Sequence, residues 1–216
     1  MPTLRGRLIL ASASPRRAQL LRQLGFEFEI TPGNVDETVL AAESPADYVA
    51  RLAQAKAAAT YANSLVEGAD LGQPRVCLGS DTSVVIDDEI LGKPGGQSEG
   101  ADMLLRLSDR SHKVLTAIAV VAGTKPSPGF EQVEVVTTTV WFRALDRSEA
   151  TWYWHTGEPQ DKAGGYGIQG IGGIFVSRIE GSYSNVVGLP LVETDKLLQA
   201  VPKDLGGEIC NGRLHG

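Results

Sequence analysis

The sequence predicts a mixed α/β (α+β) fold in which helices flank a twisted mixed sheet. Strand and helix signals alternate through the first two-thirds of the 216 residues, which is typical of α/β domains. Two long β-rich runs at 113–122 and 133–143 are joined by a Pro/Gly-rich loop, so we expect them to pair antiparallel. A chain of this length buries one substantial core, alone or with a small second lobe.

The first half of the chain opens with a strand that enters a helix directly. Ser14 suits the N-cap of that helix, and Pro15 suits its first position, where the missing N–H is not needed. Ser44 and Pro45 open a second helix in the same way. The elements expected here are a strand beginning at Leu8, a helix at 15–24, a strand at 26–30, a helix at 45–62, and strands at 75–78, 83–86 and 89–91 with a break at 79–82.

The second half is expected to continue with a helix at 98–107 and the two long strands. A capping box at 146–149 opens a short helix, and a glycine-dense segment at 164–173 leads into a strand at 174–179. A last helix is expected at 189–200. The polar, Gly-rich residues 202–216 are expected to form a disordered tail.

Composition excludes several classes of protein. A formal net charge of −6 and a pI near 5.1 argue against a general nucleic-acid binder. No run of apolar residues is long enough for a membrane span, and the N-terminus lacks the pattern of a signal peptide. Cys77 and Cys210 are far apart, so we expect two free thiols in a reducing compartment and a cytosolic protein.

Arg16 and Arg17 lie in the first turn of a helix, where partial positive charge normally attracts acidic residues. Beside free backbone N–H groups and the hydroxyls of Ser12 and Ser14, two guanidinium groups indicate a bound polyanion. The alternative is that both arginines are solvated or pair with surface carboxylates.

Asp81 lies between two β-rich segments, a common place for a carboxylate that activates water or holds a divalent cation, and equally common for a plain turn. Lys56 falls on the small-residue stripe of the second helix, where a solvated lysine is not expected unless it extends outward. Lys93 follows a strand in an exposed turn, which suits a solvated lysine or a phosphate contact.

The segment 165–170 fits the pattern G-x-G-x-x-G, but no strand precedes it and no helix follows, so we do not expect a dinucleotide site. It is a glycine-rich turn in which Gln169 offers both donors and acceptors to a ligand. No P-loop sequence is present, and His112, His155 and His215 lack zinc-ligand spacing. A metal held by carboxylates would be Mg²⁺ or Mn²⁺.

Together these segments resemble the Maf family of nucleoside triphosphate pyrophosphatases, also described as septum-formation proteins. The resemblance runs from about Leu8 to Leu198. It is carried by residues 11–17 (ASASPRR), 52–57 (LAQAKA), 79–82 (GSDT), 92–94 (GKP), 161–170 (DKAGGYGIQG), 181–183 (GSY) and 187–191 (VGLPL).

The resemblance implies a fold like that of inosine triphosphate pyrophosphatases, with a cleft between two lobes of one domain at 1–201, and a homodimer. It implies hydrolysis of dTTP, UTP or modified pyrimidine nucleotides between the α- and β-phosphates, with a divalent metal. By position, Asp81 matches the proton acceptor. Arg16, Thr82 and Gln169 match specificity positions, where the branch acting on 7-methyl-GTP has Trp, Gln and Glu. Ser12, Arg17, Lys56 and Lys93 match the phosphate site, and Glu37 matches an acidic position near the metal.

Two alternatives remain at this point. The first is a nucleotide-binding regulator of cell division with little catalysis, which the septum-formation name suggests. The second is a house-cleaning pyrophosphatase for modified or purine triphosphates. The first is disfavoured because pure binding does not require a water-activating carboxylate such as Asp81.

Overall fold

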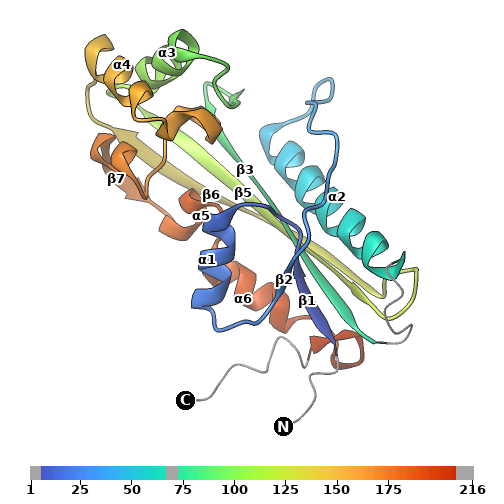
Figure 1. The fold of residues 1–216 in the computed structure, drawn as a ribbon. Helices are drawn as coiled ribbons and strands as arrows, with labels where there is room; N and C mark the ends of the chain where they lie inside the picture. The colour runs from blue at the N-terminus through green and yellow to red at the C-terminus, as the bar shows by residue number, and fades with distance from the viewer. Residues whose placement is uncertain (1–5, 67–72, 208–216) are drawn as a thin grey trace.

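The computed structural model describes residues 6–66 and 73–207, which form a seven-stranded mixed sheet with helices on both faces (Figure 1). The strands are β1 (Arg7–Leu10), β2 (Glu29–Ile30), β3 (Arg75–Ile86), β4 (Glu89–Leu91), β5 (Ser111–Gly123), β6 (Phe130–Phe142) and β7 (Val176–Glu180). The helices are α1 (Pro15–Gln23), α2 (Pro45–Val66), α3 (Gln97–Leu107), α4 (Arg147–His155), α5 (Tyr183–Val187) and α6 (Leu191–Gln199). Four 3₁₀ turns are η1 (Glu158–Asp161), η2 (Ala163–Gly165), η3 (Ile171–Phe175) and η4 (Lys203–Leu205).

The sheet has the strand order β2-β1-β3-β5-β6-β7, with β4 also paired to β3. β1 is parallel to β2 and β3, whereas the neighbouring pairs β3–β5, β5–β6 and β6–β7 are each antiparallel. The mixed α/β prediction and the antiparallel pairing of the two long strands are therefore confirmed. In the part of the chain that the structure describes, no helix has the length and apolar character needed to cross a membrane.

The core lies on both faces of the sheet. α2 covers one face, and α1 and α6 cover the other (Figure 1). A third cluster of buried side chains lies beyond β4, where α3 and α4 pack together against the far ends of β5 and β6. Cys77 is a buried free thiol in β3, and burial raises its pKa to about 12; Cys210 lies outside the described residues.

The prediction of two strands broken at 79–82 is wrong, because β3 runs without interruption from Arg75 to Ile86. Its partner β5 pairs with it from Arg75↔Gly123 to Val85↔Lys113. Gly79, which suggested a turn, instead allows close packing: a Cβ there would collide with the Ala53 carbonyl oxygen and lie 2.8 Å from Ala57 N in α2. Contacts with β5 and α2 therefore make this segment a strand, although its local sequence is typical of a turn.

Other boundaries also differ from the sequence prediction. The strand expected at 26–30 is confined to Glu29–Ile30, the strand expected at 174–179 begins at Val176 after η3, and α5 was not predicted. Residues 202–207, expected to begin a disordered tail, contain the 3₁₀ turn η4, and residues 208–216 lie outside the described part.

One edge of β3 has a gap that positions the site. β1 pairs with β3 at residues 75–78, and β4 pairs with the same strand at residues 84–86. Between them, residues 79–83 of β3 are paired only with β5. Side chains alternate between the two faces of a strand, so at this gap residues from both faces of the sheet reach one space.

Candidate functional site

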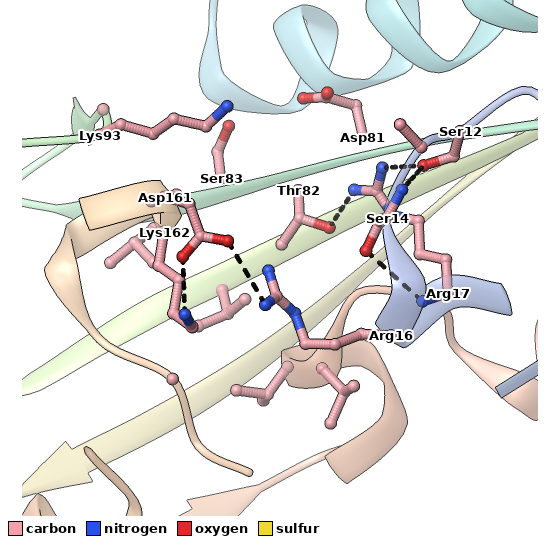
Figure 2. Close-up of a pocket in the computed structure, with 18 of the residues that line it drawn as sticks. Ser12, Ser14, Arg16, Arg17, Asp81, Thr82, Ser83, Lys93, Asp161 and Lys162 are labelled. Carbon is pink, nitrogen blue, oxygen red and sulfur yellow. Dashed lines mark hydrogen bonds and ion pairs between the residues drawn. The ribbon is translucent and has the colours of Figure 1, made fainter. Parts of the chain in front are cut away.

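A cleft of about 910 Å³ opens at the gap in the edge of β3, a volume typical of small-molecule sites. Figure 2 shows side chains from β3, the β1–α1 turn, the segment after β4 and the segment after η1 pointing toward this space. The candidate residues that line it are Ser12, Ser14, Arg16, Arg17, Glu37, Lys56, Asp81, Thr82, Lys93 and Gln169. Every residue that the sequence singled out for the site therefore lies in one cleft.

The first turn of α1 turns Arg17 inward. Ser14 is the N-cap, and its side chain accepts a hydrogen bond from Arg17 N, as predicted. The Arg17 guanidinium donates to Gly188 O at 2.9 Å, to Ser12 Oγ at 3.1 Å and to Thr82 Oγ1 at 3.0 Å. Burial lowers the pKa of Arg17, and the negative charge of Asp81 partly offsets this lowering. Arg17 has no carboxylate partner among the described residues, so its charge is available to an anion.

Thr82 belongs to a chain of hydrogen bonds behind Arg17. Its hydroxyl accepts from Arg17, and it lies 3.0 Å from Thr116 Oγ1 in β5. Thr116 donates to Asn185 O at 2.8 Å, so the proton between the two threonines comes from Thr82. This chain fixes the Thr82 hydroxyl and, through it, the direction of the Arg17 guanidinium.

Lys56 is buried between two carboxylates, and the outward-pointing alternative is wrong. Its side chain is 11% exposed, and Nζ lies 2.6 Å from Glu37 Oε1 and 2.7 Å from Asp81 Oδ1. The hydrogen bond from Lys56 lowers the pKa of Glu37. The Glu37 loop is held to α2 by Tyr48, whose hydroxyl donates to Glu37 O at 2.9 Å. Three charged groups from a loop, a helix and a strand therefore meet at one point.

Arg16 lies at the other side of the cleft, opposite Asp161 and Lys162 (Figure 2). Asp161 Oδ2 is 3.8 Å from Arg16 Nη1, and its Oδ1 is 2.7 Å from Lys162 Nζ, a hydrogen bond that lowers the pKa of Asp161. Sequence reasoning assigned no role to Asp161 or Lys162. Their position directly before a glycine-rich segment was the signal in the sequence that could have identified them.

Lys93 and Gln169 complete the lining. Lys93 extends into the cleft from the segment after β4 (Figure 2), and it forms no ion pair within the described residues. Gln169 lies between η2 and η3 on the glycine-rich segment. Ser83, on the same face of β3 as Asp81, also lines the cleft and was not predicted.

The carboxylates of Glu37 and Asp81 both contact Lys56 Nζ, so their oxygens, which are possible metal ligands, lie close together. The described residues contain no cluster of three or more His, Cys, Asp or Glu side chains arranged for a metal ion. Mg²⁺ is commonly held by one or two carboxylates together with the phosphates of a ligand. The donor set therefore fits an ion that arrives with phosphates, and does not form a complete protein cage.

Comparisons with known proteins agree with this chemistry. A family profile described as "Maf-like protein" matches residues 7–201. A dTTP/UTP pyrophosphatase of Vibrio cholerae is 50% identical over 192 residues, covering 89% of this chain and 96% of that protein. A dTTP/UTP pyrophosphatase of Colwellia psychrerythraea is 53% identical over 194 residues, covering 89% and 87%.

Among solved structures, a nucleoside-triphosphatase / dITP/XTP pyrophosphatase from Mycobacterium abscessus aligns over 64% of this chain and 75% of that chain. The identity is 18% and the TM-score is 0.36. At that score the likeness carries no conclusion.

Proposed function

The chain belongs to the Maf-like protein family, and we propose that it hydrolyses nucleoside triphosphates, dTTP and UTP first among them, to the monophosphate and pyrophosphate. The observation that carries this proposal is the convergence of the candidate cations with one buried carboxylate, Asp81, in a single cleft. A triphosphate needs cations for its oxygens and a base for water, and the cleft offers both.

Arg17 and Lys93 are the principal phosphate contacts in this proposal. They are the two candidate cations without a carboxylate partner among the described residues, whereas Lys56 pairs with Glu37 and Asp81, and Arg16 faces Asp161. Ser12 and Ser14 add hydroxyl groups at the start of α1, where the helix favours an anion.

Asp81 is proposed to orient the attacking water and accept its proton. Its Oδ1 accepts from Lys56 at 2.7 Å, and no hydrogen bond to Oδ2 comes from any described residue. Oδ2 is therefore the oxygen available to water. Lys56 holds the carboxylate in place from α2. General-base assistance of this kind contributes about 10² to 10⁴ in rate.

Glu37 and Asp81 are proposed to hold a divalent cation, Mg²⁺ or Mn²⁺, together with the phosphates. When bound, such an ion would neutralise charge on the phosphate oxygens. Water oriented by Asp81 would attack the α-phosphorus and give its proton to that carboxylate, while the bond from the α-phosphorus to the α–β bridging oxygen breaks. Arg17 and Lys93 would balance the charge of the departing pyrophosphate.

Base selection is assigned to Gln169, Arg16 and Thr82. The Gln169 amide matches the mixed donor and acceptor edge of thymine or uracil. Thr82 is assigned to base selection on the family resemblance, while its hydroxyl is hydrogen-bonded to Arg17, a phosphate contact in this proposal. No aromatic platform is needed for an unmodified pyrimidine.

The test is incubation of the purified protein with dTTP, UTP, dCTP, dATP and 7-methyl-GTP in the presence of Mn²⁺. We expect monophosphate and pyrophosphate in equal amounts, with dTTP and UTP the fastest substrates and no turnover in excess chelator. Release of diphosphate and inorganic phosphate would contradict the proposal. Tight binding of dTTP without any product would instead support the alternative function, a nucleotide-binding regulator of cell division. No contact that the structure describes in the cleft favours that alternative.

Three further properties complete the proposal. We propose that residues 1–201 act as one catalytic domain of two lobes, that the protein is a homodimer, and that it acts in the cytoplasm, without nucleic-acid polymer or membrane as partner. The family resemblance supports the first two, and the acidic composition supports the absence of a nucleic-acid partner.

A further inference from the structure

A carboxylate beneath the glycine-rich segment has no role in the chemistry described so far. Glu158 opens η1, just after α4, and its Oε1 accepts a hydrogen bond from the Tyr153 hydroxyl at 2.6 Å. Its Oε2 accepts from Ile171 N at 2.8 Å, and Oε1 also accepts from Gly172 N at 3.1 Å. Both oxygens are thus directed at the backbone of the segment that follows Gln169.

Tyr153 holds the other end of the same segment. Its hydroxyl accepts from Gly167 N at 3.1 Å while donating to Glu158. The tyrosine is fully buried, packed edge-on against Phe175 with ring centroids 5.0 Å apart. The segment is therefore pinned at Gly167 and at Ile171–Gly172, and only three residues, 168–170, lie between these points.

The glycines allow the segment to lie directly on the side chains that pin it. A Cβ on Gly170 would overlap the Glu158 carboxylate, and one on Gly167 would lie 2.7 Å from Lys162 Cε. A larger residue at Gly170 would displace the Glu158 carboxylate from its hydrogen bonds, and one at Gly167 would displace the end of the Lys162 side chain.

Gln169 depends on this support for its orientation. It lines the cleft and is exposed, and its side chain has no hydrogen-bond partner within the described ranges 6–66 and 73–207. The backbone at 168–170 therefore sets the place and direction from which the Gln169 side chain enters the cleft. Burial alone would raise the pKa of Glu158, but the hydrogen bonds from Tyr153, Gly172 and Ile171 lower it overall, which keeps the carboxylate charged.

We propose that Glu158 and Tyr153 are positioning residues for base selection, which hold residues 167–172 so that the Gln169 amide faces the nucleobase. The inference rests on the proposed function, in which Gln169 reads the base. Neither residue is a catalytic residue, because their polar atoms are engaged with the loop and with each other.

The experiment compares kcat and KM for dTTP and dCTP in the wild type, Glu158→Gln, Tyr153→Phe and Gln169→Ala, and in the double variant Glu158→Gln with Gln169→Ala. The control is Glu180→Gln, which removes an exposed carboxylate at the end of β7 whose hydrogen-bond partner is Arg178.

We expect Glu158→Gln to raise KM for dTTP about tenfold and to leave kcat within about twofold, since Asp81 lies on β3 and is untouched. The preference for dTTP over dCTP should fall by a similar factor, and Tyr153→Phe should act in the same direction. Adding Gln169→Ala to Glu158→Gln should have little further effect, because the two residues act as one unit. Glu180→Gln should keep the wild-type preference.

Additive effects in the double variant, or an equal loss of kcat for both nucleotides, would overturn the inference while leaving the proposed function intact. If Gln169→Ala itself leaves the preference unchanged, base reading by Gln169 fails, and the inference fails with it. Amide hydrogen exchange of the 164–173 region provides an independent measurement if Glu158→Gln folds poorly. Tyr153→Phe should accelerate exchange there and Glu180→Gln should not, and unchanged exchange in Tyr153→Phe would contradict the inference.

Discussion

At the scale of single residues, the central feature is an ammonium group shared by two carboxylates. Lys56 Nζ lies within 2.7 Å of both Glu37 and Asp81, and the lysine and Asp81 are buried. A buried charge is tolerated only when it is paired. The lysine therefore holds the proposed base in one orientation and occupies the space between the proposed metal ligands.

Replacing Asp81 by Asn should remove the proton acceptor and keep the shape of the side chain. We expect kcat to fall by about 10² to 10⁴ while dTTP binding, measured by calorimetry, persists. Asp88→Asn is the control, because Asp88 is an exposed residue in the turn after β3. A kcat of Asp81→Asn within about threefold of the wild type would rule out the assignment.

Replacing Lys56 by Met should make the two carboxylates more attractive to a free metal ion. We expect Mn²⁺ in the absence of nucleotide to bind about tenfold more tightly, because a positive charge is removed from between the ligands. Electron paramagnetic resonance of free Mn²⁺ measures this directly. Lys93→Met is the matched control, since Lys93 contacts neither carboxylate in an ion pair. Unchanged or weaker Mn²⁺ binding in Lys56→Met would show that the lysine does not compete with the metal.

At the scale of elements, two glycines determine how closely α2 approaches its neighbours. Gly33, in the loop that leads to Glu37, lies against the backbone of Lys56. A Cβ added to Gly33 would lie 2.9 Å from Lys56 Cα. Gly79 of β3 lies against Ala53, about one turn before Lys56, and Ala57, the residue directly after it. The loop, the helix and the strand can therefore bring Glu37, Lys56 and Asp81 together only because neither glycine has a side chain.

Gly79→Ala should push β3 away from α2. We expect the free energy of unfolding to fall by about 1–3 kcal/mol through overpacking, with kcat/KM for dTTP reduced because Lys56 moves relative to Asp81. Urea unfolding and steady-state kinetics test the two effects. The matched control is Gly96→Ala, where a Cβ would meet nothing within 4 Å. If Gly79→Ala resembles Gly96→Ala in both measurements, close packing at this point is not required.

At the scale of the whole molecule, three buried clusters pack the elements that carry the site against the rest of the fold. Two lie on the faces of the sheet and one lies beyond β4. His112 of β5 lies in the cluster beyond β4, 2.8 Å from the Tyr166 hydroxyl of the glycine-rich segment and edge-on to Phe142. Its Nδ1 has no hydrogen-bond partner in the described part of the chain. Burial lowers the pKa of His112 from 6.5 to about 4.

This histidine should make the fold sensitive to acid. The unfolded chain takes up a proton near pH 6.5, whereas the folded protein does so only near pH 4, so stability is lost as the pH falls through that range. We expect the group to lower the free energy of unfolding by about 3 kcal/mol between pH 7 and pH 4. Between pH 7 and pH 4, the free energy of unfolding of His112→Gln, measured with urea, should fall by about 3 kcal/mol less than that of the wild type. His155→Gln, at an exposed position of α4, should follow the wild-type loss, and equal losses in His112→Gln and wild type would contradict the prediction.

The extent to which the sequence predicted the structure differs between the fold and the site. The start of α1 at Ser14 and Pro15, the capping box at Asp146 and the pairing of β5 with β6 follow from local chemistry, and all three are present. The continuity of β3 through Gly79 could not be read locally, because β5 and α2, distant in sequence, stabilise it. Likewise the sequence favoured an outward-pointing, solvated Lys56, since its two acidic partners lie on other elements.

The sequence by itself determined which chemical groups are available: the arginines after a helix start, the lysines, one acidic residue in a β-rich run and a glutamine in a glycine-rich turn. Only the tertiary structure decided that they share one cleft and how they pair. The gap between β1 and β4 lets side chains from both faces of β3 enter the same space. Hydrogen bonds and ion pairs act over a few ångströms, so their partners are set by packing between segments that are distant in the chain.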